Sequence, residues 1–215
     1  MKQGRLFVLS GPSGAGKGTI CSRVIQDGTA KLSISMTTRA LRGKEIDGVS
    51  YYFVSDEEFD KTIAEGGFLE YAGIYGHRYG TPKAPVLEAM ENGQDVILEI
   101  EMQGAAQVKA NYSDAVLIFV LPPSLSELRA RLEKRNSDSP EQIIKRTEAT
   151  LSEIHRIGEY DYYVINGELE EAVDTVKKIM LAVHGDCDAK RAVRKNKVGK
   201  AALKMIKKYD EEAQK

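Results

Sequence analysis

The stretch from Leu9 to Ile20, LSGPSGAGKGTI, decides the fold, because it holds a glycine-rich turn between two ordered segments. The apolar run before it, Arg5–Leu9 (RLFVL), has the pattern of a buried strand, and Thr19–Gln26 continues with a helical pattern. The turn nearly follows G-x-x-x-x-G-K-[ST], in which backbone N–H groups and the lysine bind phosphate oxygens. Strand, glycine loop and helix in this order predict a phosphate-binding loop.

The loop differs from the full pattern at one position, since Gly18 follows Lys17 and the hydroxyl that usually ligates Mg²⁺ comes one residue later, at Thr19. Mg²⁺ keeps several waters and is held mainly by substrate phosphates, so a direct protein hydroxyl is dispensable. We therefore expect Lys17 to contact the β and γ phosphates and no side chain to ligate the metal directly. The other interpretation is a glycine-rich turn with an incidental lysine. The residues expected to form the cradle are Gly11, Pro12, Ser13, Gly14, Ala15, Gly16, Lys17, Gly18 and Thr19.

The composition is that of a soluble globular protein, either one domain with insertions or two small domains. The chain has 215 residues, of which 42% are apolar and 29% charged. A formal net charge of −1 gives no reason to expect nucleic acid or an anionic membrane as a partner. The two cysteines fit no metal or redox spacing. The sequence shows neither a signal peptide nor an apolar run near the roughly 20 residues that span a bilayer, which predicts a cytoplasmic protein.

Short apolar runs return along the chain, at 31–36, 95–100, 115–121 and 162–165. Several are apolar at successive positions, which is typical of strands covered on both faces. Helical segments lie between the later runs, and two begin with capping boxes, at Ser124–Glu127 and Ser139–Gln142. Alternating strands and helices predict an α/β fold in which a parallel sheet is flanked by helices.

The segment 37–92 differs, since it is rich in Tyr and Gly and its candidate strands, Tyr51–Val54 and Phe68–Tyr75, are short. A capping box that starts at Ser55 predicts a helix between them. We interpret this segment as a small mixed insertion. The domains expected are a core formed by 1–36 and 93–186, the insertion at 37–92, and a basic C-terminal extension at 187–215.

The C-terminal extension carries nine Lys or Arg residues and no acidic residue between Lys190 and Lys208. Val198–Tyr209 could form a basic helix. One interpretation is a solvated, partly ordered terminus. The other is an electrostatic contact with a partner subunit or a polyanion. The sequence leaves both open.

Three motifs after the loop narrow the class of protein. In chain order they are SISMTTRALRGKEIDGVSYYFV at 33–54, FLEYAGIYGHRYGTP at 68–82 and LEIEMQG at 98–104. Together with the loop, they resemble the guanylate kinase family, which phosphorylates GMP with ATP. The resemblance runs from Arg5 to about Ala182. It implies a P-loop kinase core, a GMP-binding insertion at 37–92 and a helical lid at about 131–148.

Two arginines three residues apart, Arg39 and Arg42, suit a phosphomonoester, because charge-assisted hydrogen bonds are strong there. The other interpretation is a solvated turn. The resemblance ties these arginines to the hydroxyls of Tyr51 and Tyr79 and places Ser35 in the same GMP site.

Guanine presents N1–H and N2–H₂ donors beside an O6 acceptor, so a carboxylate and a hydroxyl suit it, whereas adenine would leave the carboxylate unpaired. The resemblance assigns Glu70 and Glu101 as the carboxylates and Thr81 as the hydroxyl. Relatives often read D-x-D-V-Q-G where this chain reads E-I-E-M-Q-G, so Glu101 is one methylene longer than aspartate. Glu99 would act on Mg²⁺ through a bridging water.

The segment LRARLEKRNSDSPEQIIKR, at 128–146, resembles the family's lid, with Arg131, Arg135 and Arg146 as candidate phosphate ligands. A helix with an exposed basic face is the other interpretation. Phosphoryl transfer needs in-line positioning and charge compensation rather than a general base. We therefore assign the catalytic roles to Lys17, Arg39, Arg135 and Arg146. The resemblance places Asn166 near the adenine of ATP.

The sequence thus predicts an ATP:GMP phosphotransferase of purine nucleotide metabolism and GMP recycling, which uses Mg²⁺ with ATP and could form a homo-oligomer. One alternative is a non-catalytic guanylate-kinase-like interaction module, but such modules look degraded in the phosphate loop. Another is a kinase of a phosphorylated sugar, which should lack the guanine-reading residues.

Overall fold

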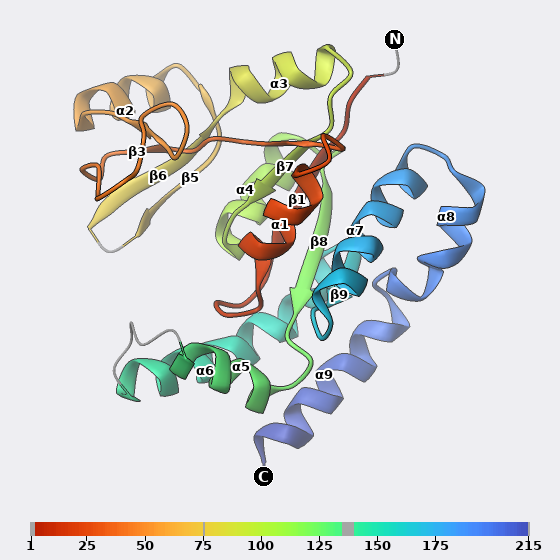
Figure 1. Cartoon of the computed structure of the whole chain (residues 1–215). Coiled ribbons are helices and arrows are strands. Elements are labelled where there is room, and N and C mark those ends of the chain that lie inside the picture. Colours follow the sequence, from red (N-terminus) through yellow and green to blue (C-terminus); the bar gives the residue numbers. More distant parts are fainter. Residues whose placement is uncertain (1–2, 75, 135–139, 215) are drawn as a thin grey trace. The chain divides into compact units, whose positions relative to one another are not determined.

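The computed structural model describes residues 3–74, 76–134 and 140–214 (Figure 1). The chain divides into two compact units. The first unit comprises Met1–Phe7 and Ala30–Ala115, and the second comprises Val8–Thr29 and Val116–Lys215. The division falls inside the first strand, β1.

The main sheet has the strand order β2-β7-β1-β8-β9. Its strands are β1 (Leu6–Ser10), β2 (Lys31–Leu32), β7 (Val96–Glu99), β8 (Val116–Leu121) and β9 (Tyr162–Ile165). The pairs β2–β7 and β8–β9 are parallel, with Ile118 opposite Tyr162. Every residue of β1 is buried, as the unbroken apolar run predicts for a strand covered on both faces. The predicted α/β fold with a parallel sheet is confirmed.

The helices of the second unit follow the glycine loop and the strands β8 and β9. They are α1 (Lys17–Ile25), α5 (Leu125–Lys134), α6 (Pro140–His155), α7 (Leu169–Val183), α8 (Cys187–Ala192) and α9 (Lys200–Ala213), with 3₁₀ turns at Arg156–Glu159 and Arg194–Asn196. The backbone N–H of Glu127 donates to Ser124 Oγ at 3.1 Å, which confirms the cap of α5. The second predicted cap, Ser139, lies outside the described residues. Helix α7 packs against α1 and β9.

The first unit holds a mixed sheet in the order β4-β3-β6-β5. Its elements are β3 (Met36–Thr37), β4 (Tyr52–Phe53), β5 (Phe68–Ile74), β6 (His77–Pro82), α2 (Asp56–Ala64), α3 (Lys83–Glu91) and α4 (Met102–Asn111). Strands β3 and β4 are parallel, whereas β6 pairs antiparallel with β3 and β5. Ser55 caps α2 by accepting from the Glu58 N–H at 3.2 Å. Helix α4 packs against β5.

The run 31–36, which the sequence suggests as one strand, is divided between the two sheets, so that prediction is wrong. Strand β2 pairs with β7, and the Ser33 N–H still donates to Ile97 O at 3.0 Å. Two residues on, the Ser35 carbonyl accepts from the Tyr52 N–H at 2.9 Å in the second sheet. An apolar pattern indicates which residues are buried but not which strand they pair with. The sequence therefore could not predict that this run is divided between two sheets.

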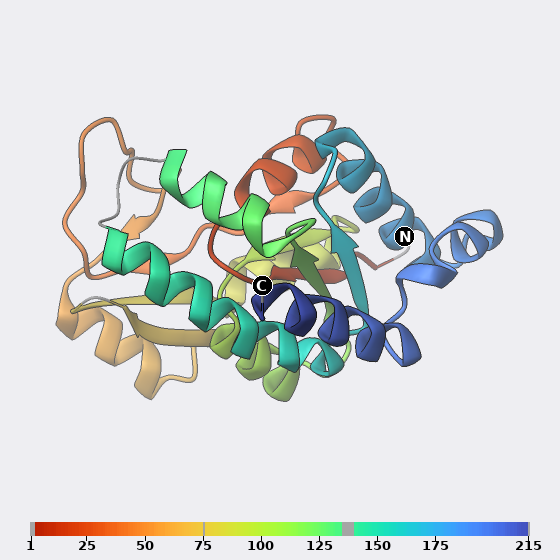
Figure 2. The same cartoon turned by 90° about the horizontal axis from the view of Figure 1, so that it is seen from below.

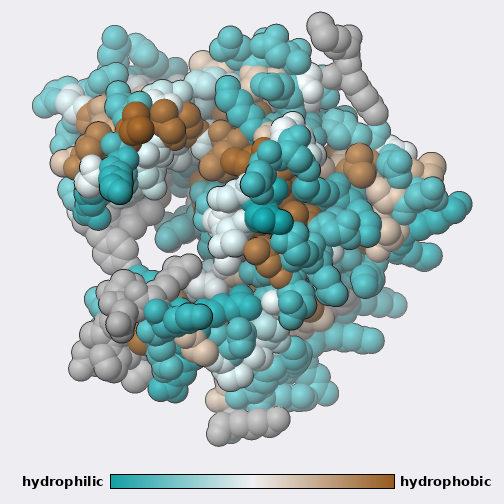
Figure 3. All heavy atoms as spheres, viewed as in Figure 1, coloured by the Kyte–Doolittle hydropathy of each residue, from teal (hydrophilic) through white to brown (hydrophobic). Residues whose placement is uncertain are grey.

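The described part of the C-terminal extension is folded, so the interpretation as a solvated terminus is wrong. Val193 and Tyr209 are only 1% and 0% exposed. Lys197 forms an isolated antiparallel bridge with Tyr162 of β9. Helix α9 contacts α5 and α6 and lies alongside α6 in Figure 2. Its outward side is mainly hydrophilic in Figure 3.

Within the described part of the chain, no helix is both long and apolar enough to cross a bilayer.

Candidate active site

The glycines of the loop between β1 and α1 are required by both backbone conformation and space. Gly11 and Gly16 have φ of 136° and 92°, a region that side chains disfavour. A Cβ at Gly11 would lie 2.4 Å from Val120 O, and one at Gly16 would lie 2.2 Å from Asn166 Nδ2. The loop therefore keeps its backbone bare before the N-terminus of α1, which is the arrangement that binds phosphate.

Lys17 lies partly buried at the start of α1 and reaches back over the loop. Its Nζ donates to Gly11 O at 2.6 Å and Pro12 O at 3.1 Å. The ammonium thus adds positive charge to that of the helix N-terminus. Gly18 offers no side chain, and Thr19 is exposed on the first helical turn.

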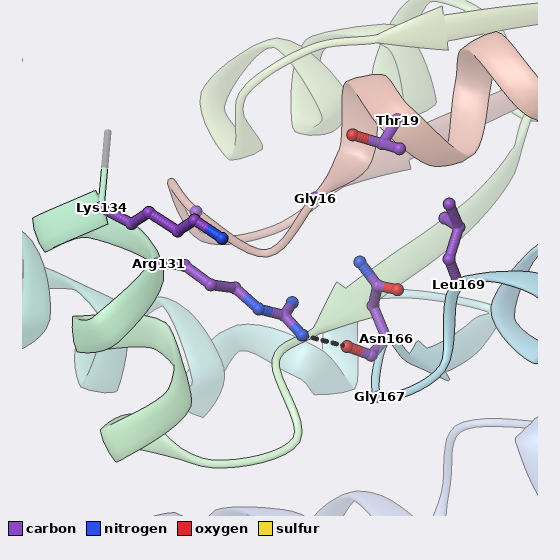
Figure 4. A pocket seen from close by; sticks show the side chains of 8 residues that line it. Gly16, Thr19, Arg131, Lys134, Asn166, Gly167 and Leu169 are labelled. Carbon is purple, nitrogen blue, oxygen red and sulfur yellow. Dashed lines mark hydrogen bonds between the residues drawn. The ribbon is translucent and has the colours of Figure 1, made fainter. Parts of the chain in front are cut away.

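A pocket of about 340 Å³ opens beside the loop (Figure 4). Asn166, at the end of β9, is 6% exposed, and its Nδ2 donates to Ala15 O at 2.7 Å. Arg131 of α5 donates from Nη2 to Asn166 O at 3.0 Å, the bond that Figure 4 marks. The structure therefore joins two predicted site residues to the loop. The residues that line the pocket are Gly14, Gly16, Thr19, Arg131, Lys134, Asn166, Gly167 and Leu169.

The second predicted lid arginine in the described residues, Arg146 of α6, also reaches the loop. Its Nη1 donates to Ser13 Oγ at 3.2 Å. Arg135 lies outside the described residues. Both α5 and α6 therefore bring an arginine to the part of the second unit that holds the glycine loop.

In the first unit, Arg39 is the centre of a polar cluster and is only 7% exposed. Its Nε donates to Tyr79 Oη at 3.2 Å, and its guanidinium lies 5.4 Å from the ring centroid of Tyr51. Nη2 donates to Glu45 Oε1 at 2.7 Å and Nη1 to Glu45 Oε2 at 3.0 Å. This hydrogen-bonded ion pair raises the pKa of Arg39 and lowers the pKa of Glu45. Three predicted residues, Arg39, Tyr51 and Tyr79, thus lie together.

Glu70 and Thr81 form a second buried polar group in the first unit. They are 6% and 1% exposed and face each other across β5 and β6. Thr81 Oγ1 donates to Glu70 Oε1 at 2.6 Å. A Cβ at Gly104, in α4, would lie 2.7 Å from Glu70 Oε2, so a glycine leaves room for the carboxylate. Burial raises the pKa of Glu70, while the Thr81 hydrogen bonds oppose the shift.

Residues 3–183 match the family model described as guanylate kinase. The chain belongs to the guanylate kinase family. A guanylate kinase of Caldanaerobacter subterraneus subsp. tengcongensis is 50% identical over 182 residues, which cover 84% of this chain and 88% of the relative. A guanylate kinase of Thermus thermophilus is 54% identical over 180 residues, with 84% and 82% covered. The resemblance inferred from the motifs is confirmed.

Two further matches extend this result. A guanylate kinase of Clostridioides difficile is 46% identical over 213 residues, which cover 99% of this chain and 98% of the relative. The crystal structure of guanylate kinase from Anaplasma phagocytophilum aligns with a TM-score of 0.69 at 31% identity. That alignment covers 86% of this chain and 89% of the crystallised one.

The structure also places four further residues that the guanylate kinase resemblance assigns. Ser35 is half-buried beside β4, and the side chain of Arg42 is exposed. Glu101 is exposed at the N-cap of α4, and Glu99 is exposed at the end of β7. Their roles in this member of the guanylate kinase family stay predictions.

Sequence reasoning missed Glu45, although it contacts the guanidinium that the guanylate kinase resemblance assigns to phosphate. Its carboxylate also accepts from the Arg42 N–H at 2.8 Å. The available signal was an acidic residue closely following two arginines. This signal does not suffice for a prediction, because the sequence separation of residues in a loop does not show which side chains are in contact.

Proposed function

We propose that this chain transfers the γ-phosphoryl group of ATP to GMP, giving ADP and GDP. The observation that carries the proposal is the buried pair of Glu70 and Thr81, in the same unit as the Arg39 cluster. A buried carboxylate is costly unless it meets donors, and a guanine base would supply two. The curated relatives, which are named guanylate kinases, support this function over that of a non-catalytic module.

The first unit would bind GMP through two groups of side chains. Glu70 would accept from guanine N1–H and N2–H₂, with Thr81 contacting the base edge and Glu101 assisting. Arg39, with the hydroxyls of Tyr51 and Tyr79, would bind the phosphate of GMP, as would Arg42, while Ser35 would line the guanine pocket. Arg39 suits this role because a guanidinium matches phosphate oxygens with several N–H donors at once.

The second unit would bind ATP through the loop backbone and its cations. The N–H groups of the loop and Lys17 would bind the phosphates, and Arg131 and Arg146 would compensate charge on the transferred group. Arg135 would add a third cation. The phosphate of GMP is itself a nucleophile near neutral pH, so these residues act by orientation and charge and not as general bases.

The donor groups on the chain fit Mg²⁺ that is held by the phosphates of ATP. Position 18 lacks a side chain, while Thr19 offers an exposed hydroxyl and Glu99 an exposed carboxylate. Mg²⁺ bound to ATP would neutralise charge on the β and γ phosphates. Glu99 would orient water in the metal's hydration shell. We place the reaction in the cytoplasm, in purine nucleotide metabolism and GMP recycling.

A coupled assay of ATP-dependent conversion of GMP tests the proposal, with AMP, CMP and ribose 5-phosphate as competing acceptors. We expect turnover of GMP alone, because among these acceptors only guanine presents two adjacent N–H donors to the carboxylate of Glu70. Comparable turnover of AMP and GMP would refute the recognition of guanine. Tight GMP binding without turnover would favour a non-catalytic module.

A further inference from the structure

The C-terminal segment that begins after residue 183 lies outside the match to the family model. Its last helix, α9, is nevertheless packed into the second unit. Tyr209 has 0% exposure, and its hydroxyl donates to Pro122 O. Burial raises the pKa of Tyr209, so the phenol remains a hydrogen-bond donor. A helix that only added charge to the surface would not bury its tyrosine.

Helix α9 holds the first turn of α5 through two more contacts. Glu212 Oε2 accepts from the Leu125 N–H at 2.9 Å, and Lys208 Nζ donates to Pro123 O at 2.7 Å. An acidic side chain at the N-terminus of a helix accepts from a backbone N–H that has no partner within the helix. Its negative charge also interacts favourably with the positive end of the helix dipole. The start of α5 therefore depends on a residue 87 positions further along the chain.

The same helix also contacts the end of α6. Asp210 Oδ1 lies 2.9 Å from His155 Nε2, at the last residue of α6. Helix α9 packs against both α5 and α6, and Figure 2 shows it running beside α6. It thus links the two helices that carry Arg131 and Arg146.

Helix α5 transmits this anchoring to the glycine loop by direct contact. A Cβ at Gly14 would lie 2.8 Å from Leu128 Cδ1 and 3.1 Å from Leu132 Cδ2. The same two leucines form a buried cluster with Ile143 of α6. A shift of α5 would therefore move the loop wall and the guanidinium of Arg131 together.

A pocket of about 670 Å³ opens at the junction of α5, α6 and α9. It is bounded by Leu125, Leu151 and Glu212, among other residues. At this end of α5, beyond its buried leucines, the contacts from α9 therefore help to fix the helix.

We propose that Tyr209 and Glu212 are positioning residues of the ATP site, which hold the start of α5 so that Arg131 and the loop wall keep their places. This inference rests on the proposed function for its kinetic readout but not for its binding readout. Neither residue belongs to the proposed nucleotide contacts. Glu212 acts through the Leu125 N–H at the start of α5, and Tyr209 acts through the Pro122 carbonyl in the segment that leads into α5.

Two substitutions at Glu212 separate positioning from folding. Glu212→Ala removes the acceptor for the Leu125 N–H, whereas Glu212→Gln keeps an acceptor oxygen at the same place. Tyr209→Phe removes only the hydroxyl. Lys207→Ala, an exposed position on the same helix, is the matched control. Melting curves of all four variants establish that each is folded at the assay temperature.

We expect Glu212→Ala and Tyr209→Phe to weaken ATP binding, measured by calorimetry on the full chain, by about 3- to 10-fold. GMP binding should be unchanged, because its residues lie in the other unit. Glu212→Gln and Lys207→Ala should behave as wild type. In the kinetic assay, the KM for ATP should rise and kcat fall, with the KM for GMP unaltered.

A second arm tests the route through Arg131. If Glu212 acts on that arginine, Glu212→Ala should have little further effect on kcat in an Arg131→Ala background. Unchanged ATP affinity in both Glu212→Ala and Tyr209→Phe overturns the proposal, as does an equal loss of ATP and GMP affinity. An absence of turnover in wild type would overturn the proposed function alone, because ATP binding still tests the positioning role.

Discussion

The two units offer different kinds of polar group to the nucleotides that we propose they bind. The second unit presents a bare backbone, a helix N-terminus and a lysine within ten residues of one loop. The first unit relies on side chains that are distant in sequence, such as Glu70 and Thr81, and buries them. Backbone recognition suits phosphates, which all look alike, whereas buried side chains can discriminate one base from another.

The largest expected effect is a loss of activity on substitution of Lys17, in the glycine loop of the second unit. Lys17→Ala should lower kcat by about 100-fold or more, because it removes the cation that we propose contacts the β and γ phosphates. GMP affinity, measured by calorimetry, should stay within about twofold of wild type. A strong loss of GMP affinity would contradict the division of labour between the units. Lys31→Ala, an exposed position in the first unit, serves as the control.

The next effect concerns the buried carboxylate. Glu70→Gln should lower GMP affinity by about 10- to 100-fold, because an amide accepts only part of what a carboxylate accepts. ATP affinity should not change. Unchanged GMP kinetics in this variant would rule out the role of Glu70.

The same substitution should raise thermal stability in the absence of nucleotide. Because burial raises the pKa of Glu70 above its ordinary value of 4.5, wild type loses stability as pH rises above that value and the buried group ionises. Glu70→Gln avoids this loss, so its Tm should exceed that of wild type at pH 7 by about 2 to 4 °C. Below about pH 4.5 the two melting curves should converge, and a constant difference would contradict the mechanism.

Glu45, in the same unit, should have the opposite effect on stability at neutral pH. The guanidinium of Arg39 lowers the pKa of Glu45, so the ion pair stabilises the protein above pH 4.5 and the effect is lost as pH falls further. Glu45→Gln should therefore lower Tm at pH 7. Addition of GMP should raise the Tm of this variant by more than it raises the Tm of wild type, because the phosphate of GMP would give the buried guanidinium of Arg39 a counter-charge. Thermal melts with and without GMP decide this. An equal GMP-induced shift in both proteins would disprove it.

The smallest expected effect returns to the loop. Asn166→Ala removes the amide that donates to Ala15 O, which supports the loop from outside. We expect the KM for ATP to rise about 3-fold and the KM for GMP to stay constant. Asn196→Ala, which removes a buried amide in the same unit away from the loop, controls for general loosening. Equal effects of the two substitutions would mean that Asn166 acts on stability alone.

The sequence predicted the features that short segments determine. The glycine loop, the cap at Ser124 and the strand 162–165 each depend on neighbouring residues, and the structure has them where expected. The meeting of Arg39 with Tyr79, in contrast, was available only by resemblance, because nothing local links positions 40 residues apart.

Other features could not be predicted, because they depend on tertiary contacts. The split of 31–36 between two sheets requires knowledge of both partners. The pairing of Glu45 with Arg39 depends on the course of a loop. The burial of Tyr209 could not be predicted because nine basic residues precede it, which is typical of a solvated tail.

The bridge between Lys197 and Tyr162 has a consequence for solubility. Strand β9 is the last in the sheet order, and a terminal strand exposes unpaired N–H and C=O groups to which a second chain could add. The segment before α9 covers part of this edge, because Val198 N donates to Asp161 O at 3.1 Å and Asn196 Nδ2 to Tyr163 O at 3.1 Å. We therefore expect the C-terminal extension to reduce edge-to-edge association through β9.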